Sequence, residues 1–293
     1  MDEALLKEKE ERLSSLLEQL GSVVVAYSGG VDSSLLSYYA RKVLGGRARI
    51  VIAVSPSLAQ EELVAARAQA EAFQWDLIEI RTGEVDKPEY RRNDALRCYF
   101  CKSTLFEDLE KLSRELACDH IAYGANQDDL GDFRPGHKAA RERRVKSPLQ
   151  ECGLSKEEIR ALARRAGLPS WDRPQAACLS SRFQTHEPIS VELLSRVERA
   201  EQYLHALGFR QLRVRHHGDL ARIELDCHEL PRLSSDRELM SRVAAELKKL
   251  GYRYVVLDLE GYRRGGANVL AKPGSAAQAD TSEGGEERGR RSS

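Results

Sequence analysis

Residues 23–34 read Val-Val-Val-Ala-Tyr-Ser-Gly-Gly-Val-Asp-Ser-Ser, and this stretch decides the fold of the N-terminal half. Its β-branched run favours a strand, and a helix-compatible segment begins at Val31, after the two glycines. Glycines permit a tight turn, and the first turn of a new helix directs unpaired N–H groups toward an anion. The stretch therefore predicts a strand, a phosphate-binding loop and a helix.

The loop is not the common nucleoside-triphosphate loop, because no Gly-Lys-Ser/Thr follows the glycines. The pattern Ser-Gly-Gly-x-Asp-Ser, residues 28–33, resembles the pyrophosphatase loop (PP-loop) of enzymes that cleave ATP between its α and β phosphates. Such enzymes leave AMP on an acceptor carboxylate, carbonyl or base. A plain Gly-Gly turn between a strand and a helix is the alternative.

The composition narrows the class of protein. The 293 residues, 41% of them hydrophobic, suffice for two domains with real cores. The 46 Lys and Arg residues balance 46 Asp and Glu residues, so no overall positive charge indicates a nucleic-acid partner. No apolar run approaches the roughly 18 residues of a membrane helix, and residues 1–20 predict an amphipathic helix, not a signal peptide. We expect a cytoplasmic protein whose six cysteines are reduced.

Strand and helix patterns alternate through the first half, as is typical of a parallel sheet covered by helices. Strands are expected at residues 23–27, 50–54, 77–80 and 120–123, and helices at about 31–44, 59–73 and 102–117. In such sheets ligands bind beyond the carboxyl ends of the strands. We therefore expect an α/β fold with a PP-loop ATP pyrophosphatase domain over residues 1–185.

The pattern changes after the capping-box helix of Ser155 and Glu158 and the loop that follows it. Helices are expected at about 189–207 and 235–250, with strands at 211–216, 221–226 and 254–259. Residues 186–272 thus predict a smaller α/β domain for substrate binding or oligomerisation. Residues 273–293 contain no large apolar residue, which predicts a disordered tail.

Three cysteines are candidates for chemistry. Cys98 and Cys101 have the Cys-x-x-Cys spacing, but zinc would need a second pair that the sequence lacks. A thioredoxin-like redox role and two unrelated buried cysteines are the alternatives. Cys178 lies in an expected loop flanked by Arg173 and Arg182, where a thiolate would be stabilised, although isolated loop cysteines are more often inert.

The order of the motifs is more specific than any one of them. In sequence they are the PP-loop, Cys-x-x-Cys-Lys (98–102), residues 124–136, Ser-Pro-Leu (147–149), Ala-Cys-Leu-Ser-Ser-Arg (177–182) and Gly-Tyr-Arg-Arg-Gly (261–265). This order resembles the ATP-dependent sacrificial sulfur transferases (LarE), which are related to the NAD and GMP synthetase pyrophosphatases. The resemblance spans residues 5–270, nearly everything except the tail.

The resemblance implies a step in the synthesis of the nickel-pincer nucleotide. ATP adenylylates a carboxylate of a pyridinium dicarboxylate mononucleotide, a relative of nicotinic acid mononucleotide, and sulfur then displaces AMP. In one branch the sulfur comes from the cysteine that matches Cys178, which becomes dehydroalanine. The additional Cys98 and Cys101 resemble the three-cysteine branch, in which the thiolates hold a [4Fe–4S] cluster with one open iron for the donated sulfide. Relatives are homo-oligomers, and the sulfide donor is not identified by the sequence.

The ATP site is expected at the strand ends. Its phosphate-binding residues are expected to be Ser28, Gly29, Gly30 and Ser33. Asp32 is assigned to Mg²⁺, because a carboxylate beside phosphate requires a cation. Lys102 would neutralise charge on the α-phosphate, unless it is an ordinary solvated lysine. Val54 is expected to border the adenosine. The polar loop residues Gly124, Asp129, Asp132 and Arg134 are expected to complete this site, with a plain turn as the alternative.

The smaller domain contributes arginines. Strand alternation places Arg213 and Arg215 on one face, which suits bidentate binding of a phosphate or is simply a solvated sheet face. The resemblance favours a site for the substrate's phosphate, with Glu201 as a weaker candidate and Arg182 serving the substrate or the cluster.

Three other functions are compatible with parts of the sequence. A tRNA-thiolating enzyme would use the same loop and cysteines, but the chain has no net charge and no separate RNA-binding domain. An amide-forming synthetase needs no cysteines, and the chain leaves no room for a glutaminase domain. A nucleotide-binding regulator would bind ATP without releasing pyrophosphate.

Overall fold

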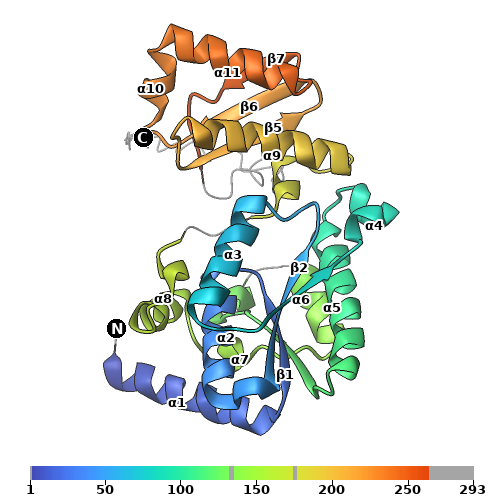
Figure 1. The fold of residues 1–293 in the computed structure, drawn as a ribbon, viewed down its shortest axis with the longest axis vertical. Helices are drawn as coiled ribbons and strands as arrows, with labels where there is room; N and C mark the ends of the chain where they lie inside the picture. Colours follow the sequence, from blue (N-terminus) through green and yellow to red (C-terminus); the bar gives the residue numbers. More distant parts are fainter. Residues whose placement is uncertain (1, 132–134, 174–176, 264–293) are drawn as a thin grey trace, which may run out of the picture.

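The computed structural model describes residues 2–131, 135–173 and 177–263, which contain two separate β-sheets (Figure 1). The first sheet is parallel, with the strand order β3-β2-β1-β4. Its strands are β1 (Val23–Tyr27), β2 (Ala48–Val54), β3 (Leu77–Arg81) and β4 (His120–Tyr123). These are the four strands expected from the sequence, and the α/β fold is confirmed.

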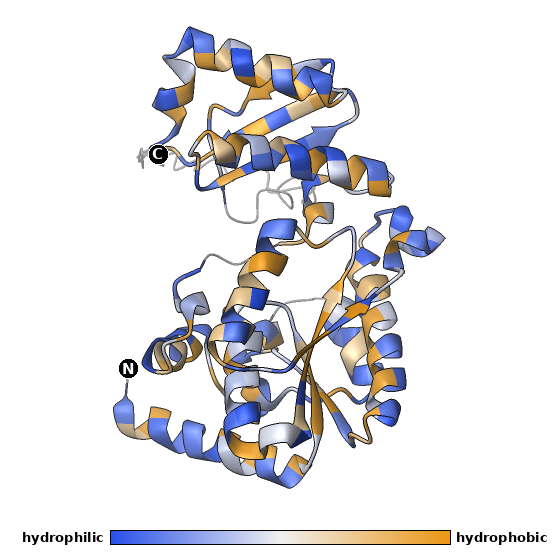
Figure 2. Cartoon of the chain, in the orientation of Figure 1, coloured by the Kyte–Doolittle hydropathy of each residue, from blue (hydrophilic) through white to orange (hydrophobic). Residues whose placement is uncertain are grey.

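Helices cover both faces of this sheet, which explains why all five residues of β1 are buried. They are α1 (Glu3–Leu20), α2 (Val31–Leu44), α3 (Gln60–Ala72), α4 (Pro88–Arg91), α5 (Arg97–Glu115), α6 (Pro135–Glu142), α7 (Pro148–Glu151) and α8 (Lys156–Arg165). One apolar core joins the sheet to α1, α2, α3 and α8, and another joins it to α5 and α6. Figure 2 shows the apolar strands between helices whose outer faces are polar.

The second sheet has the order β5-β6-β7, in which β5 and β6 are antiparallel and β6 and β7 parallel. Its elements are β5 (Leu212–His217), β6 (Leu220–Leu225), β7 (Tyr254–Leu257), α9 (Val191–Ala206), α10 (Leu230–Ser234) and α11 (Arg237–Lys249). Short 3₁₀ turns are η1 (Gly45–Arg47), η2 (Glu84–Asp86), η3 (Gln127–Gly131), η4 (Pro169–Trp171) and η5 (Leu179–Arg182). A third apolar core belongs to this sheet.

Helix α5 begins five residues before the expected start at residue 102. Asp94 causes the earlier start, because its carboxylate accepts the Leu96 N–H (2.8 Å) and its carbonyl accepts the Arg97 N–H (3.0 Å). Cys98 and Cys101 therefore lie three residues apart on one helix face. The expected loop after α8 also contains the turns η4 and η5.

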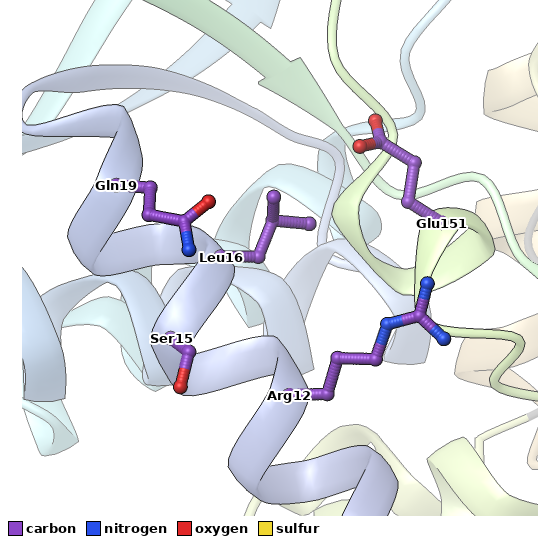
Figure 3. A pocket seen from close by; sticks show the side chains of 5 residues that line it. All are labelled: Arg12, Ser15, Leu16, Gln19 and Glu151. Atoms are coloured by element: carbon purple, nitrogen blue, oxygen red, sulfur yellow. The ribbon is translucent and has the colours of Figure 1, made fainter.

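Helix α1 confirms the N-terminal helix expected over residues 1–20, and it buries Leu6, Leu13, Leu17 and Leu20 against the first sheet's core. A pocket of about 270 Å³ lies between α1 and α7 (Figure 3), lined by Arg12, Ser15, Leu16, Gln19 and Glu151. None of these residues is a candidate site residue. Within the described ranges no helix is long and apolar enough to cross a membrane. The expected tail at 273–293 lies outside those ranges.

Candidate active site

The PP-loop is closed by its own hydrogen bonds. Gly29 has φ +77°, which favours glycine, and a Cβ there would lie 3.2 Å from the Ala66 Cβ. The Ser28 N–H donates to the Ser33 Oγ (3.1 Å), and that hydroxyl donates to the Gly30 carbonyl (3.0 Å). The Ser33 hydroxyl therefore holds the loop in shape, while the first backbone N–H groups of α2 supply the anion-binding end.

Gly124 follows β4 and contacts the first turn of α2 directly. A Cβ at this position would lie 2.6 Å from the Ser33 backbone nitrogen and 2.9 Å from the Asp32 carbonyl carbon. Such distances exclude any side chain unless the backbone moves. Gly124 thus brings the end of the neighbouring strand against the PP-loop.

The Asp32 carboxylate is shared by two partners that come from other segments. Its Oδ2 is ion-paired with the Lys156 Nζ, and its Oδ1 accepts a hydrogen bond from the Asn126 side-chain amide (3.3 Å). The Asn126 N–H in turn donates to the Asp129 Oδ2 (3.1 Å). The polar loop after β4 therefore reaches Asp32. Arg134 and Asp132 of the expected site lie outside the described residues.

The end of β2 is tied to the segment that carries Cys178. Val54 is the last residue of β2, and its carbonyl accepts the Thr82 N–H (3.3 Å). Three residues on, the Ser57 carbonyl accepts the Leu179 N–H (2.8 Å), and the Ser57 hydroxyl donates to the buried Glu84 (3.0 Å). The segment that follows Val54, which is expected to border the adenosine, is therefore hydrogen-bonded to the segment that carries Cys178.

Lys102 lies on α5, where α6 packs closely. A Cβ at Gly136 would lie 3.1 Å from the Lys102 Cγ, so the glycine leaves room for the lysine stem. The ammonium lies 5.9 Å from the centre of the Phe106 ring. Among the described residues no carboxylate is ion-paired with Lys102.

The three candidate cysteines are free thiols, with Cys98 and Cys178 exposed and Cys101 half-buried. Burial, and then the nearby Glu84 and Cys178, raise the pKa of Cys101 to about 12. An Arg97 Nη lies 3.9 Å from the Cys98 Sγ, and the other donates to the Ser180 carbonyl (2.8 Å). Burial disfavours the Arg97 charge, but Cys178 and Cys98 outweigh it and raise the pKa of Arg97. Arg97 therefore compensates Cys98 and Cys178, whereas Lys102 is the cation that acts on Cys101.

Within the described residues, one group of three metal-ligand side chains gathers its ligand atoms within 4.8 Å. It consists of Asp226, Cys227 and His228. They are consecutive, and the Asp226 carboxylate already accepts the His228 N–H (2.9 Å). The three cysteine sulfurs of Cys98, Cys101 and Cys178 are therefore not drawn together as tightly as ligands of a single ion.

Arg182 and Glu201 form a buried pair with two hydrogen bonds of 3.0 and 2.9 Å. Another nitrogen of Arg182 donates to the carbonyls of Ala177 (2.6 Å) and Cys178 (3.0 Å). Glu201 also accepts the Val214 N–H (2.9 Å). All of these groups have partners within the chain. The pair therefore ties the backbone at Cys178 to α9 and, through Val214, to β5 of the second sheet.

Arg213 and Arg215 differ from the expectation that both offer their guanidinium groups to a phosphate. Arg215 is buried and binds the Glu224 Oε2 through two nitrogens (3.0 and 2.8 Å) and the Ser181 carbonyl through another (2.9 Å). Arg213 stacks on the Tyr262 ring at 5.3 Å, and no described carboxylate is ion-paired with it. Burial and the neighbouring Arg182 lower the pKa of Arg213. Arg213 donates to the Leu212 carbonyl (2.6 Å) and, unlike Arg215, is ion-paired with no carboxylate of the described residues.

No family model matches the chain. It is 46% identical over 272 residues to an uncharacterized protein of Synechocystis sp., covering 92% of this chain and 100% of the relative. It is 34% identical over 266 residues to the pyridinium-3,5-bisthiocarboxylic acid mononucleotide synthase of Lactiplantibacillus plantarum, covering 90% and 95%. The chain belongs to this synthase (LarE) family.

About half of this LarE-family chain is also similar in sequence to argininosuccinate synthases. It is 31% identical over 171 residues to the argininosuccinate synthase of a Synechococcus strain, covering 53% of this chain and 42% of that protein. This partial match agrees with the PP-loop fold of the first sheet.

Two residues of this family member were missed from the sequence. Lys156 lies in the first turn of a helix, where the helix dipole disfavours a cation. That unfavourable position is the sequence signal that could have identified it. Arg97 immediately precedes the Cys-x-x-Cys pair, but its position between Cys98 and Ser180 depends on the early start of α5. No local pattern reveals that contact.

Proposed function

We propose that this chain is an ATP-dependent sulfur transferase of nickel-pincer nucleotide synthesis. It adenylylates a carboxylate of a pyridinium dicarboxylate mononucleotide and replaces the AMP with sulfur to give a thiocarboxylate. The observation that carries the proposal is the match to the named synthase over 90% of this chain and 95% of that protein. The geometry of the PP-loop and the position of Arg97 among the thiols support it.

In the first half of the reaction a substrate carboxylate oxygen attacks the α-phosphorus of ATP, and the bond to the bridging oxygen breaks to release pyrophosphate. The backbone N–H groups at the start of α2 bind the phosphates, and Lys102 offsets the charge that develops on the α-phosphate. Asp32 and Asp129 present the carboxylate oxygens that Mg²⁺ prefers, so the residues present fit this ion.

In the second half a sulfur nucleophile attacks the carbonyl carbon of the acyl adenylate, and the C–O bond to AMP breaks. When bound, a [4Fe–4S] cluster on Cys98, Cys101 and Cys178 supplies an open iron that carries transferable sulfide. The donor set fits the group, because all three thiols are free and Arg97 offers a compensating charge. Arg182 fixes the Cys178 backbone, and Arg213 is available to the substrate's phosphate.

The decisive experiment measures pyrophosphate release from ATP with and without the pyridinium dicarboxylate mononucleotide, using protein purified without oxygen. We expect substrate-dependent release, bound iron with acid-labile sulfide, and loss of that iron in Cys98→Ala. Release that ignores the substrate would contradict the proposed function. An iron-free protein whose Cys178 keeps its mass after turnover would contradict both sources of sulfur.

A further inference from the structure

Arg97 joins the two segments that carry the candidate cysteines. It is the first residue of α5 and directly precedes Cys98. Its Nη2 lies 3.9 Å from the Cys98 Sγ. Its Nη1 donates to the carbonyl of Ser180 in η5 (2.8 Å), the turn that follows Cys178. Arg97 and Ser180 are 83 positions apart in the sequence. One guanidinium group therefore connects α5 to the segment that carries Cys178.

The orientation of this guanidinium group is fixed by Asn93. The Asn93 Oδ1 accepts a second hydrogen bond from the Arg97 Nη1 (2.6 Å). Asn93 is 1% exposed, and its amide nitrogen donates to the carbonyls of Gln184 (2.7 Å) and Glu187 (3.0 Å). Because two oxygens bind the Nη1, the planar guanidinium group is held with its Nη2 toward the Cys98 sulfur.

The charge of Arg97 has no carboxylate partner among the residues that the structure describes, although the side chain is partly buried. Burial opposes this charge, but the sulfurs of Cys178 and Cys98 outweigh it and raise the pKa of Arg97. A buried charge without a counter-ion is costly, and a neutral amide could donate similar hydrogen bonds. The presence of a charge therefore indicates that anionic sulfur is its partner.

The negative charge at these thiols changes during the proposed reaction. A [4Fe–4S] cluster on three thiolates is an anion, and sulfide on its open iron makes it more negative. Net charge and hydrogen bonds to the sulfurs determine how well a cluster tolerates such charge. At Cys101 the neighbouring Glu84 disfavours negative charge, and Lys102 favours it. Arg97 supplies positive charge at the other two thiols, Cys98 and Cys178.

We propose that Arg97 is a positioning residue of the sulfur-transfer step, whose charge acts through Cys98 and the Cys178 segment to hold anionic sulfide on the cluster. The inference deepens the proposed function and rests on its cluster form. It assigns Arg97 to the second half of the reaction alone, so nucleotide binding should not depend on it. Loss of the charge should weaken sulfide binding and make the cluster harder to reduce, because reduction also adds negative charge.

Two measurements test this role without turnover, on the full chain purified without oxygen and carrying its cluster. The first is a titration with sodium sulfide, followed by the electron paramagnetic resonance signal of the reduced cluster. We expect Arg97→Gln to bind sulfide about tenfold more weakly, the usual loss for a hydrogen bond to a charged group. The second is a redox titration. The midpoint potential of Arg97→Gln should be lower, by about 59 mV for each tenfold change in a one-electron equilibrium.

Matched variants separate the charge of Arg97 from its structural contacts. Arg97→Lys keeps the charge but not the planar fork, and it should stay close to the wild type in both titrations. Arg92→Gln removes an exposed charge shortly before α5 and should change neither result. All three variants should bind α,β-methylene-ATP, which cannot be cleaved, as tightly as the wild type does.

Equal sulfide affinity and equal potential in Arg97→Gln and the wild type would overturn the role of Arg97 alone. Where Arg97→Gln retains no iron, the iron content of Arg97→Lys decides. Iron retained in the lysine variant supports a role of the charge, whereas iron lost from both variants would show a structural tie and overturn the inference. A wild type without iron would overturn this inference and the cluster form of the proposed function. Substrate-dependent pyrophosphate release by that protein would still support the proposed function itself.

Discussion

The PP-loop and the arginine pairs around Cys178 are built on opposite principles. The PP-loop is a backbone structure whose shape depends on positions without a side chain, Gly29 and Gly124. The Cys178 segment is held by long charged side chains, the buried pairs Arg182–Glu201 and Arg215–Glu224. The first region should therefore be sensitive to added atoms, and the second to removed charges.

The largest effect is expected from Glu201→Gln. The substitution leaves the Arg182 guanidinium buried without its counter-charge, and breaking such a pair costs about 3–5 kcal/mol of the free energy of unfolding. Chemical denaturation monitored by circular dichroism measures it. Glu79→Gln is the control, because its partner Arg67 is exposed and such pairs contribute little. Similar changes in both variants would remove the distinction between the two regions.

Gly124→Ala tests the other region. The added Cβ must displace the Ser33 backbone, which it would otherwise approach to 2.6 Å, and a displacement of about 1 Å in a positioning element reduces a rate by about 100-fold. Pyrophosphate release is the measurement. Gly46→Ala is the matched control, since nothing lies within 4 Å of a Cβ there. Full activity of Gly124→Ala would show that the strand end does not shape the loop.

His216 allows a pH test of the second region. It is buried, stacks on Phe183 at 5.0 Å and contacts the Tyr252 hydroxyl (3.2 Å). Burial lowers its pKa, with Arg196 and His217 adding to the effect and Glu187 opposing it. The unfolded chain therefore binds more protons below the ordinary histidine value, so stability should fall as the pH drops below about 6.5.

The slope for one such proton is at most about 1.4 kcal/mol per pH unit. Denaturation series between neutral and mildly acidic pH should show a shallower slope in His216→Phe than in the wild type. His228→Gln, at an exposed position, should retain the wild-type slope. An unchanged slope in His216→Phe would place the acid sensitivity elsewhere.

The contrast also explains what the sequence could predict. The strand, PP-loop and helix of residues 23–44 are contiguous, so local patterns indicate them correctly. The Arg215–Glu224 pair is different, because Arg215 lies opposite Arg222 in the register and reaches Glu224 diagonally. Alternation placed Arg213 and Arg215 on one face but could not show that one of them is already bound. Sites built from distant side chains require the strand register, which local patterns do not contain.

Ser155→Ala should have the smallest effect of these variants. The serine hydroxyl accepts the Glu158 N–H (3.3 Å) as half of the capping box, and loss of such a cap costs about 1 kcal/mol of stability. The next residue, Lys156, is held separately by Asp128 through its backbone N–H. The free energy of unfolding should therefore decrease while the affinity for α,β-methylene-ATP stays unchanged. A large loss of that affinity would mean that the cap, and not Asp128, fixes the backbone from which Lys156 reaches Asp32.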